Sequence, residues 1–201
     1  MMNIFMVISF SLDMICMAWI KVIDDSEADE RLKRVYDELK RRRGKIANIL
    51  KIHSLLPETM KDHMELYSHI MFNKSSLSRE DKELIAVVVS KLNNCSYCIH
   101  HHVEALNFYW KDKEKIERFL RDLDCSCFSS KQQAVLDYTM KLTRSPDLVE
   151  ESDVVGLRKQ GLTDAEILEV ALIVSYFNFV NRMALGLHVR FTDEEMTGYR
   201  Y

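Results

Sequence analysis

The feature that most constrains this chain is a long apolar stretch from Ile167 to Leu187. It follows Thr163-Asp-Ala-Glu166, which has the spacing of a capping box and therefore predicts the start of a helix. The predicted helix is apolar around nearly its whole circumference and needs protein cover on most sides. A small monomer covers such a helix poorly, so we expect part of it to lie at a subunit interface. A membrane span is disfavoured by the polar residues Glu169, Asn178, Asn181 and Arg182 within the stretch.

The rest of the chain is also typical of helices. Only five Gly and two Pro occur in 201 residues, and β-branched residues form short clusters rather than alternating runs. We therefore predict an all-α fold, a compact multi-helix bundle. The expected helices are one capped by Asp24–Ser26 and ending near Gly44, two that begin at Pro57 and Arg79, three over Cys95–Trp110, Asp112–Leu123 and Ser130–Thr143, and a segment between Pro146 and Gly161.

Two of the predicted helices resemble each other at an offset of 85 residues. The corresponding positions are Ser78 with Thr163, Asp81 with Glu166, and Ala86–Asn93 with Ala171–Asn178. In the second copy Val180 and Met183 stand where the first has Cys95 and Cys98. A degenerate internal duplication explains this pattern, and so does chance similarity between two buried helices.

Charge and cysteine content limit the kinds of partner and the cellular compartment that we expect for this protein. The net charge of −3 and the pI near 6.2 give no electrostatic reason to expect a nucleic-acid partner. The basic run Lys40–Arg43 ends a predicted helix, where cations complement the helix dipole. Five cysteines in a chain of this size do not form the pattern of a secreted disulfide framework. We expect a cytoplasmic protein without a nucleic-acid or membrane partner.

Residues 1–16 differ from the rest of the chain. They are strongly apolar, but they lack Lys and Arg and have no clear signal-peptide cleavage site. Met17 begins a sequence typical of a soluble N-terminus. We therefore expect residues 1–16 to be an extension outside the core and residues 17–201 to form a single helical domain. A targeting segment and an element packed at a subunit interface are the alternatives for residues 1–16.

The candidate chemistry is concentrated between Glu83 and His102. Asn93-Asn94 interrupts the helical pattern, and Asn94 can cap a new helix that begins at Cys95. Cys95 and Cys98 would then lie on one helix face with Cα atoms about 5–6 Å apart, within disulfide range. Backbone N–H groups at a helix start stabilise a thiolate. His102 lies one turn after Cys98 on the same stripe and can take a thiol proton.

Glu83 lies 12 residues before Cys95, on the preceding predicted helix. Its carboxylate borders an apolar run, so it could be desolvated and hold His102 in the required tautomer. A glutamate in the first turn of a helix is more commonly exposed to solvent, where it favours the helix dipole. The spacing alone does not decide between these two interpretations.

A thiol pair with a neighbouring base suits thiol–disulfide chemistry. One thiolate attacks the terminal oxygen of a hydroperoxide and becomes a sulfenic acid, and the partner thiol then condenses with it to a disulfide. A C-x-x-C pair is a moderate signal for this chemistry, and the histidine four residues later strengthens it.

These residues resemble the motif of a known family. Glu83…Cys95-Ser-Tyr97-Cys98-Ile-His-His-His102 is similar to E-x11-C-x-[YH]-C-x3-H of the carboxymuconolactone decarboxylase-like superfamily, in particular its alkylhydroperoxidase D-like (AhpD-like), peroxidase-related enzymes. The similarity extends from about Met17 to about Leu187. It implies an all-helical homo-oligomeric antioxidant enzyme with peroxiredoxin-type activity. Its reductant would be an external thiol, dithiol or adaptor protein, and it would need no cofactor besides a redox-active Cys95–Cys98 disulfide.

The resemblance also implies roles for single residues. Cys98 would react with the peroxide and Cys95 would be its disulfide partner. Glu83 and His102 would form the proton relay, and Tyr97 would line the substrate site. Some relatives have His at the position of Tyr97. The lactone decarboxylases of the superfamily lack the cysteine pair, so we do not expect decarboxylation.

Three other functions remain open from the residues alone. A protein disulfide oxidoreductase or redox sensor would use the same thiol pair. A structural zinc site could combine Cys95, Cys98 and His102 with Glu83 or a neighbouring His, although three ligands along one helix make a cramped tetrahedron. The third alternative is a non-catalytic protein with inert buried cysteines.

Several other chemically capable residues have structural interpretations. The stripe Met60, Met64, Tyr67 and Met71 is predicted to be core packing. Cys125 and Cys127 lie in a predicted linker, and we expect them to be unrelated to the chemistry. The remaining histidines are expected to be structural or on the surface (His53, His63 and His69) or to point to other faces of their helix (His100 and His101).

Overall fold

The structure is a computed structural model that describes residues 17–191 and residue 195. Helices account for all regular secondary structure in these residues, which confirms the all-α prediction. Residues 1–16 lie outside the described residues, so the proposed boundary at Met17 stays a prediction. The α-helices are α1 (Glu30–Arg43), α2 (Asn48–Lys51), α3 (Pro57–Phe72), α4 (Arg79–Leu92), α5 (Ser96–Trp110), α6 (Lys113–Asp122), α7 (Ser130–Arg144), α8 (Glu151–Lys159) and α9 (Asp164–Gly186).

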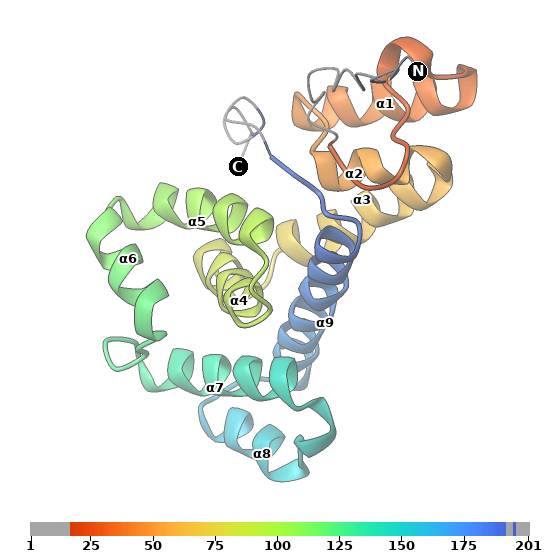
Figure 1. Cartoon of the computed structure of the whole chain (residues 1–201). Coiled ribbons are helices and arrows are strands. Elements are labelled where there is room, and N and C mark those ends of the chain that lie inside the picture. The colour runs from red at the N-terminus through yellow and green to blue at the C-terminus, as the bar shows by residue number, and fades with distance from the viewer. Residues whose placement is uncertain (1–16, 192–194, 196–201) are drawn as a thin grey trace, which may run out of the picture.

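Helix α4 occupies the centre of the bundle, between α5, α7 and α9 (Figure 1). Ser78 and Asp81 form the predicted capping box at its start. Every side chain from Lys82 to Ser90 is buried, because packed helices surround α4. Fully burying an aliphatic side chain contributes about 1.5–3 kcal/mol. The apolar run of α4 is therefore a main source of stability for the part of the bundle that carries Glu83.

Helix α9 begins at the predicted capping box of Thr163 and Glu166 and runs unbroken alongside α4 (Figure 1). It is the one helix in the described residues that is long and apolar enough to cross a membrane, and 56% of its most apolar window is buried in the chain. A soluble core helix can have the same length and composition. The side chains of α9 that stay exposed include Leu168, Leu172, Phe179 and Leu185.

The junction between α4 and α5 differs from the prediction by one residue. Helix α5 begins at Ser96, and Cys95 is its N-cap residue, without a side-chain capping bond. Asn94 does not cap the helix but adopts a left-handed conformation with φ of 54°. Asparagine tolerates this conformation better than most residues. The sharp turn lets the Cys95 N–H donate to the Ser90 carbonyl at 3.0 Å and folds α5 back onto α4.

The N-terminal helices also follow the predicted pattern, with one correction. Asp29 is the N-cap residue of α1, whereas Asp24 caps a short 3-10 turn before it. Gly44 ends α1 with φ of 83°, a left-handed conformation that glycine adopts without strain. Pro57 begins α3, and Met60 and Met64 are buried, as expected for core packing.

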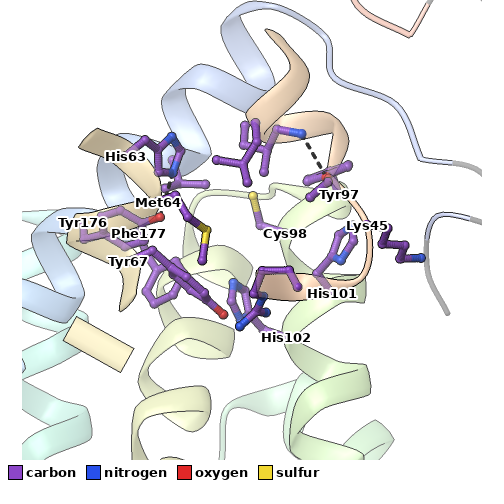
Figure 2. A pocket seen from close by; sticks show the side chains of 15 residues that line it. Lys45, His63, Met64, Tyr67, Tyr97, Cys98, His101, His102, Tyr176 and Phe177 are labelled. Carbon is purple, nitrogen blue, oxygen red and sulfur yellow. Dashed lines mark hydrogen bonds between the residues drawn. The ribbon is translucent and has the colours of Figure 1, made fainter. Parts of the chain in front are cut away.

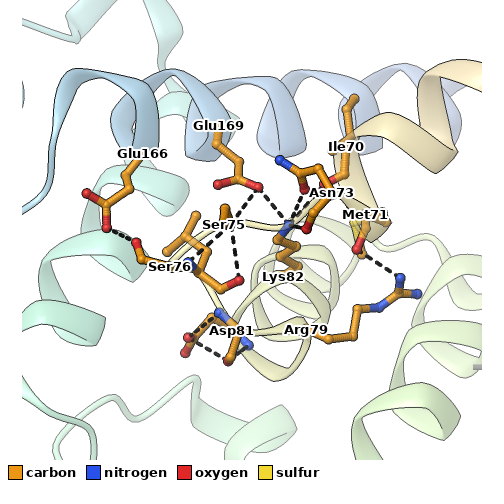
Figure 3. Close-up of polar contacts among 12 residues, drawn as sticks. Ile70, Met71, Asn73, Ser75, Ser76, Arg79, Asp81, Lys82, Glu166 and Glu169 are labelled. Carbon is orange, nitrogen blue, oxygen red and sulfur yellow. Dashed lines mark hydrogen bonds and ion pairs between the residues drawn. The ribbon is translucent and has the colours of Figure 1, made fainter.

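A buried polar cluster fastens the loop between α3 and α4 to α9 (Figure 3). The Lys82 Nζ lies 2.7 Å from Glu169 Oε1 and also donates to the carbonyls of Ile70 and Asn73. Ser75 Oγ donates to the same carboxylate at 3.0 Å. Only 1% of the Lys82 side chain is exposed, so its charge depends on these partners. The cluster therefore holds the start of α4, one turn before Glu83, against α9.

The offset of 85 residues relates two helices that pack against each other. Asn93 Nδ2 donates to Asn178 Oδ1 at 3.0 Å, and these two residues are counterparts in the repeat. Helix α4 ends at Leu92, whereas α9 continues for another two turns past the corresponding position. The duplication itself stays a prediction.

Candidate functional site

The two cysteines lie at the start of α5, and both are buried free thiols. Cys98 lines a cavity between α5, α9 and the N-terminal helices (Figure 2). Cys95 does not line this cavity but faces a separate cleft beside the end of α9. The structure thus gives the two thiols different access, with Cys98 as the sulfur next to the cavity.

The two sulfurs share a hydrogen bond. This bond from the Cys98 thiol lowers the pKa of Cys95 below its ordinary value and outweighs the opposing effect of burial. The bond to Cys95 and then burial raise the pKa of Cys98. When the pair loses one proton, Cys95 is therefore the favoured site of the negative charge, and the Cys98 thiol donates to it.

Asn181 supports the cysteine pair from α9. Its amide bonds the Cys98 sulfur and lowers the pKa of that thiol, against the effects of Cys95 and burial. The same amide donates to Ser90 Oγ at 3.3 Å, and its oxygen accepts from Asn93 Nδ2 at 3.0 Å. Asn181 is fully buried. In the sequence, the only indication of a role for Asn181 is that it is a polar residue in an apolar helix.

Glu83 and His102 form a direct hydrogen bond from neighbouring helices. The distance from His102 Nδ1 to Glu83 Oε2 is 2.7 Å. Only 1% of Glu83 is exposed, so the interpretation of Glu83 as a solvent-facing residue is wrong. Neighbouring helices cover this part of α4, and the position of Glu83 in the sequence does not reveal that cover. This bond occupies His102 Nδ1. The other ring nitrogen, Nε2, does not take part in it, and His102 lines the cavity.

Arg79 holds the other side of the Glu83 carboxylate. Its guanidinium lies 2.8 Å through Nε and 2.6 Å through Nη2 from Glu83 Oε1, and Nη2 also donates to Tyr67 Oη at 3.2 Å. Burial alone would raise the pKa of Glu83, but the bonds from His102 and Arg79 outweigh burial and keep this pKa below its ordinary value. Glu83 is therefore a carboxylate at neutral pH. Arg79 was missed from the sequence, although it stands one helical turn before Glu83.

The cavity has a volume of about 110 Å³. Its wall is mainly apolar and aromatic, and it also includes the ionisable side chains of Arg43, Lys45, His63, His101 and His102 (Figure 2). An engineered apolar cavity of about 150 Å³ holds a benzene molecule, so this space suits a ligand of a few heavy atoms. The residues that line it include Arg43, Lys45, Ile49, Leu50, His63, Met64, Tyr67, Tyr97, His101, His102, Tyr176, Phe177 and Val180.

Tyr97 lies in the cavity wall. Its hydroxyl donates to Glu195 Oε1 at 2.7 Å and accepts the Ile49 N–H at 3.2 Å. The ring centroids of His101 and Tyr97 lie 4.5 Å apart, with the rings tilted by 47°. His101 lines the same cavity, so the expectation that it points to another face is wrong. His101 Nε2 also lies 3.3 Å from Glu195 Oε2. Glu195 is far from Tyr97 in the sequence, so no sequence pattern indicates the hydrogen bond between them.

Two other expectations concern residues with possible site chemistry. His63, which is expected to be structural or on the surface, is buried and lines the cavity. Cys125 and Cys127 lie between α6 and α7 and do not line the cavity. Within residues 17–191 and 195, no group of three or more His, Cys, Asp or Glu side chains is arranged to hold a metal ion. The zinc alternative therefore has no ligand set in the described part of the chain.

Known proteins resemble this chain both in sequence and in structure. Residues 57–140 match the model of the carboxymuconolactone decarboxylase family, and this segment includes Glu83, both cysteines of the pair and His102. A peroxidase-related protein from Silicibacter sp. TM1040 is 26% identical, with a TM-score of 0.75 over 92% of this chain and 94% of that one.

Two further solved structures share the fold. The AhpD core of an uncharacterized peroxidase-related protein from Ralstonia eutropha JMP134 is 23% identical, with a TM-score of 0.78 over 90% of this chain and 95% of that one. The debrominase Bmp8, in complex with 2,3,4-tribromopyrrole, is 17% identical, with a TM-score of 0.71 over 88% and 92%. The fold thus occurs in proteins with different activities. The fold is AhpD-like, and residues 57–140, less than half of the chain, are similar to the carboxymuconolactone decarboxylase family.

Proposed function

We propose that this protein is a thiol-dependent hydroperoxide reductase. The observation that carries the proposal is the position of Cys98 in a small cavity, with Cys95 bonded to its sulfur and with His102, which Glu83 holds, in the wall. A cavity of about 110 Å³ favours a small hydroperoxide over the disulfide of another protein as the oxidant. This size argument sets the proposal apart from a protein disulfide oxidoreductase or redox sensor.

In the first step, Cys98 attacks the substrate. His102 takes the Cys98 proton, and the Glu83 carboxylate stabilises the imidazolium that results. The thiolate then attacks the terminal oxygen of the hydroperoxide and breaks the O–O bond, which gives a sulfenic acid on Cys98 and an alkoxide. The alkoxide takes the proton from His102 and leaves as an alcohol. No net proton is exchanged with solvent in this step.

In the second step, Cys95 resolves the sulfenic acid. The lowered pKa of Cys95 favours loss of its proton, which gives the attacking thiolate. This thiolate attacks the sulfur of the sulfenic acid and forms the Cys95–Cys98 disulfide, and the expelled hydroxide takes a proton from solvent to become water. An external thiol or dithiol then reduces the disulfide by two electrons. The cleft beside Cys95 is the route we propose for this reductant.

The proposal is tested by hydroperoxide consumption with a dithiol reductant. We expect Cys98→Ser to abolish turnover and His102→Ala to lower the rate and shift its pH profile. Cys127→Ser, at an exposed cysteine outside the cavity, is the matched control and should keep the wild-type rate. Full turnover by the Cys98→Ser variant would rule out the mechanism.

The debrominase with the same fold suggests a second candidate, reductive removal of a halogen from a small aromatic ring. The observation that favours it is the aromatic wall of Tyr67, Tyr176 and Phe177 beside Cys98. The Cys98 thiolate would take the halogen, the ring carbon would take a proton, and Cys95 would then displace the halide to form the disulfide. Release of bromide from 2,3,4-tribromopyrrole, with no hydroperoxide consumption, would select this candidate.

We also propose that the protein is a homo-oligomer of the cytoplasm. Leu168, Leu172 and Phe179 form an exposed apolar stripe on α9, which another subunit could cover. A reducing compartment suits an enzyme whose resting state needs two free thiols. Light scattering should give a mass above 23.7 kDa for the wild type, and Leu172→Glu should lower it toward the monomer.

A further inference from the structure

A second line of hydrogen bonds leads from the cavity wall to the surface, and the mechanism above does not use it. Tyr176 Oη lies 2.7 Å from His63 Nε2, and His63 Nδ1 lies 3.1 Å from His53 Nε2 (Figure 2 shows the first of these contacts). The line ends with His53 Nδ1, 2.9 Å from Thr59 Oγ1. Tyr176 and His63 are buried, and Thr59 is exposed.

The direction of each hydrogen bond follows from the surface end of the line. Thr59 Oγ1 donates its own proton to the Leu56 carbonyl at 2.8 Å, so it accepts from His53 Nδ1–H. A neutral histidine has one N–H. Since His53 Nδ1 carries that proton, His53 Nε2 accepts from His63 Nδ1–H, and His63 Nε2 accepts from the Tyr176 hydroxyl.

Both histidines are neutral at pH 7, as this assignment requires. Burial and the neighbouring His53 lower the pKa of His63 to about 3, and burial also lowers the pKa of His53. Burial raises the pKa of Tyr176, so its hydroxyl stays protonated. The Tyr176 hydroxyl therefore donates its proton in the hydrogen bond to His63 Nε2. Toward a ligand in the cavity, Tyr176 Oη can accept a hydrogen bond but cannot donate one.

We propose that Tyr176 Oη accepts a hydrogen bond from the terminal O–H of the hydroperoxide and thereby turns the terminal oxygen toward Cys98. The inference rests on the proposed function and adds a rule for its substrate. The cavity should prefer a peroxide with a free O–H over electrophiles that lack a donor. The proton of the terminal oxygen remains on that oxygen in the sulfenic acid, so Tyr176 orients the substrate without exchanging a proton.

The surroundings of Tyr176 favour such discrimination. Met64 and Phe177 also line the cavity, and they offer a bound hydroperoxide no strong acceptor. Beside these groups, the Tyr176 oxygen can replace the hydrogen bond that the O–H of the hydroperoxide made to water. A ligand without a donor neither gains from Tyr176 nor loses when its hydroxyl is removed.

The test compares two reagents that react with the same sulfur. In the Cys95→Ser background, the rate of Cys98 oxidation by tert-butyl hydroperoxide is measured beside its rate of modification by methyl methanethiosulfonate, which has no O–H or N–H. Tyr176→Phe should lower the hydroperoxide rate about tenfold, the effect of one hydrogen bond, and leave the other rate within twofold. Tyr138→Phe, at a half-buried tyrosine outside the cavity, should change neither rate.

A second variant guards against misfolding of Tyr176→Phe. His63→Leu frees the Tyr176 proton and should lower the hydroperoxide rate while the methanethiosulfonate rate is kept. An equal fall in both rates, or no change in either, would overturn the inference and leave the proposed function intact. A wild-type Cys98 that reacts with methyl methanethiosulfonate but not with hydroperoxide would overturn both.

Discussion

Three buried side chains determine where charge resides in the site: Glu83, Asn181 and Cys95. Glu83 is a carboxylate because His102 and Arg79 outweigh its burial. The hydrogen bond from the Cys98 thiol favours ionisation of Cys95, whereas Asn181 favours charge on Cys98 itself. The contacts of Glu83 with His102 and of Asn181 with Cys98 join different helices, so residue spacing alone could not reveal them.

The role of Glu83 predicts that a substitution of this residue lowers activity although both cysteines of the pair are still present. Glu83→Gln keeps the shape of the side chain but removes the charge that stabilises the His102 imidazolium. We expect the rate of hydroperoxide consumption to fall at least about tenfold. The upper limit of the loss is the roughly 10²–10⁴-fold rate increase that general acid–base catalysis typically contributes. Glu104→Gln, at an exposed position on α5, is the control and should keep the wild-type rate. An undiminished rate in Glu83→Gln would remove Glu83 from the relay.

The contact of Asn181 predicts a change in thiol ionisation. In a variant whose other cysteines are Ser, Asn181→Leu removes the amide that bonds the Cys98 sulfur. The pKa of Cys98 should rise, so the midpoint of its alkylation by iodoacetamide should move to higher pH. An unchanged midpoint would show that the amide does not stabilise the thiolate.

At the scale of the helices, local sequence signals predicted the elements well. The capping boxes at Ser78 and Thr163 and the stop at Gly44 have local causes, and the structure contains all three. The start of α5 was misplaced by one residue because Asn94 enters a left-handed turn, which packing of α5 on α4 stabilises. Tertiary contacts also bury Lys82 and Glu83 near the start of α4, which no local signal could predict.

The ion pair of Lys82 and Glu169 predicts a large effect on stability. Lys82→Met leaves the Glu169 carboxylate buried without its cation, which typically costs about 3–5 kcal/mol. The double variant Lys82→Met/Glu169→Leu should recover much of this loss, because it removes both charges. Urea unfolding measures these free energies, with Lys91→Met on the same helix as the control. A midpoint of Lys82→Met equal to that of the wild type would contradict the prediction.

The capping box of α9 predicts how stability depends on pH. Hydrogen bonds from Ser76 and Thr163, together with Lys131, lower the pKa of Glu166 from 4.5 to about 2. A depressed folded-state pKa stabilises the protein above the unfolded value and loses this contribution as pH falls from about 4.5 to about 2. Glu166→Gln should therefore lose less stability than the wild type over this range. Parallel pH curves of unfolding free energy would contradict the assignment.

At the scale of the whole molecule, sequence patterns predicted the fold class and the motif residues but not the cavity. The cavity is built from side chains of α3, α5 and α9, together with residues near the end of α1. Tyr176 and His63 are 113 residues apart in sequence and meet only in the folded chain. The central position of α4 brings Glu83 to His102, and α9 supplies Asn181 and Tyr176 to the same site.

The measurement that tests the central claim most directly is the chemical state of Cys98 after one equivalent of hydroperoxide. In the Cys95→Ser variant the sulfenic acid has no resolving thiol. Mass spectrometry with a dimedone trap should therefore find the adduct on Cys98. In the wild-type chain the same treatment should give a Cys95–Cys98 disulfide and no adduct. An unmodified Cys98 in both proteins, with the hydroperoxide unconsumed, would contradict the account.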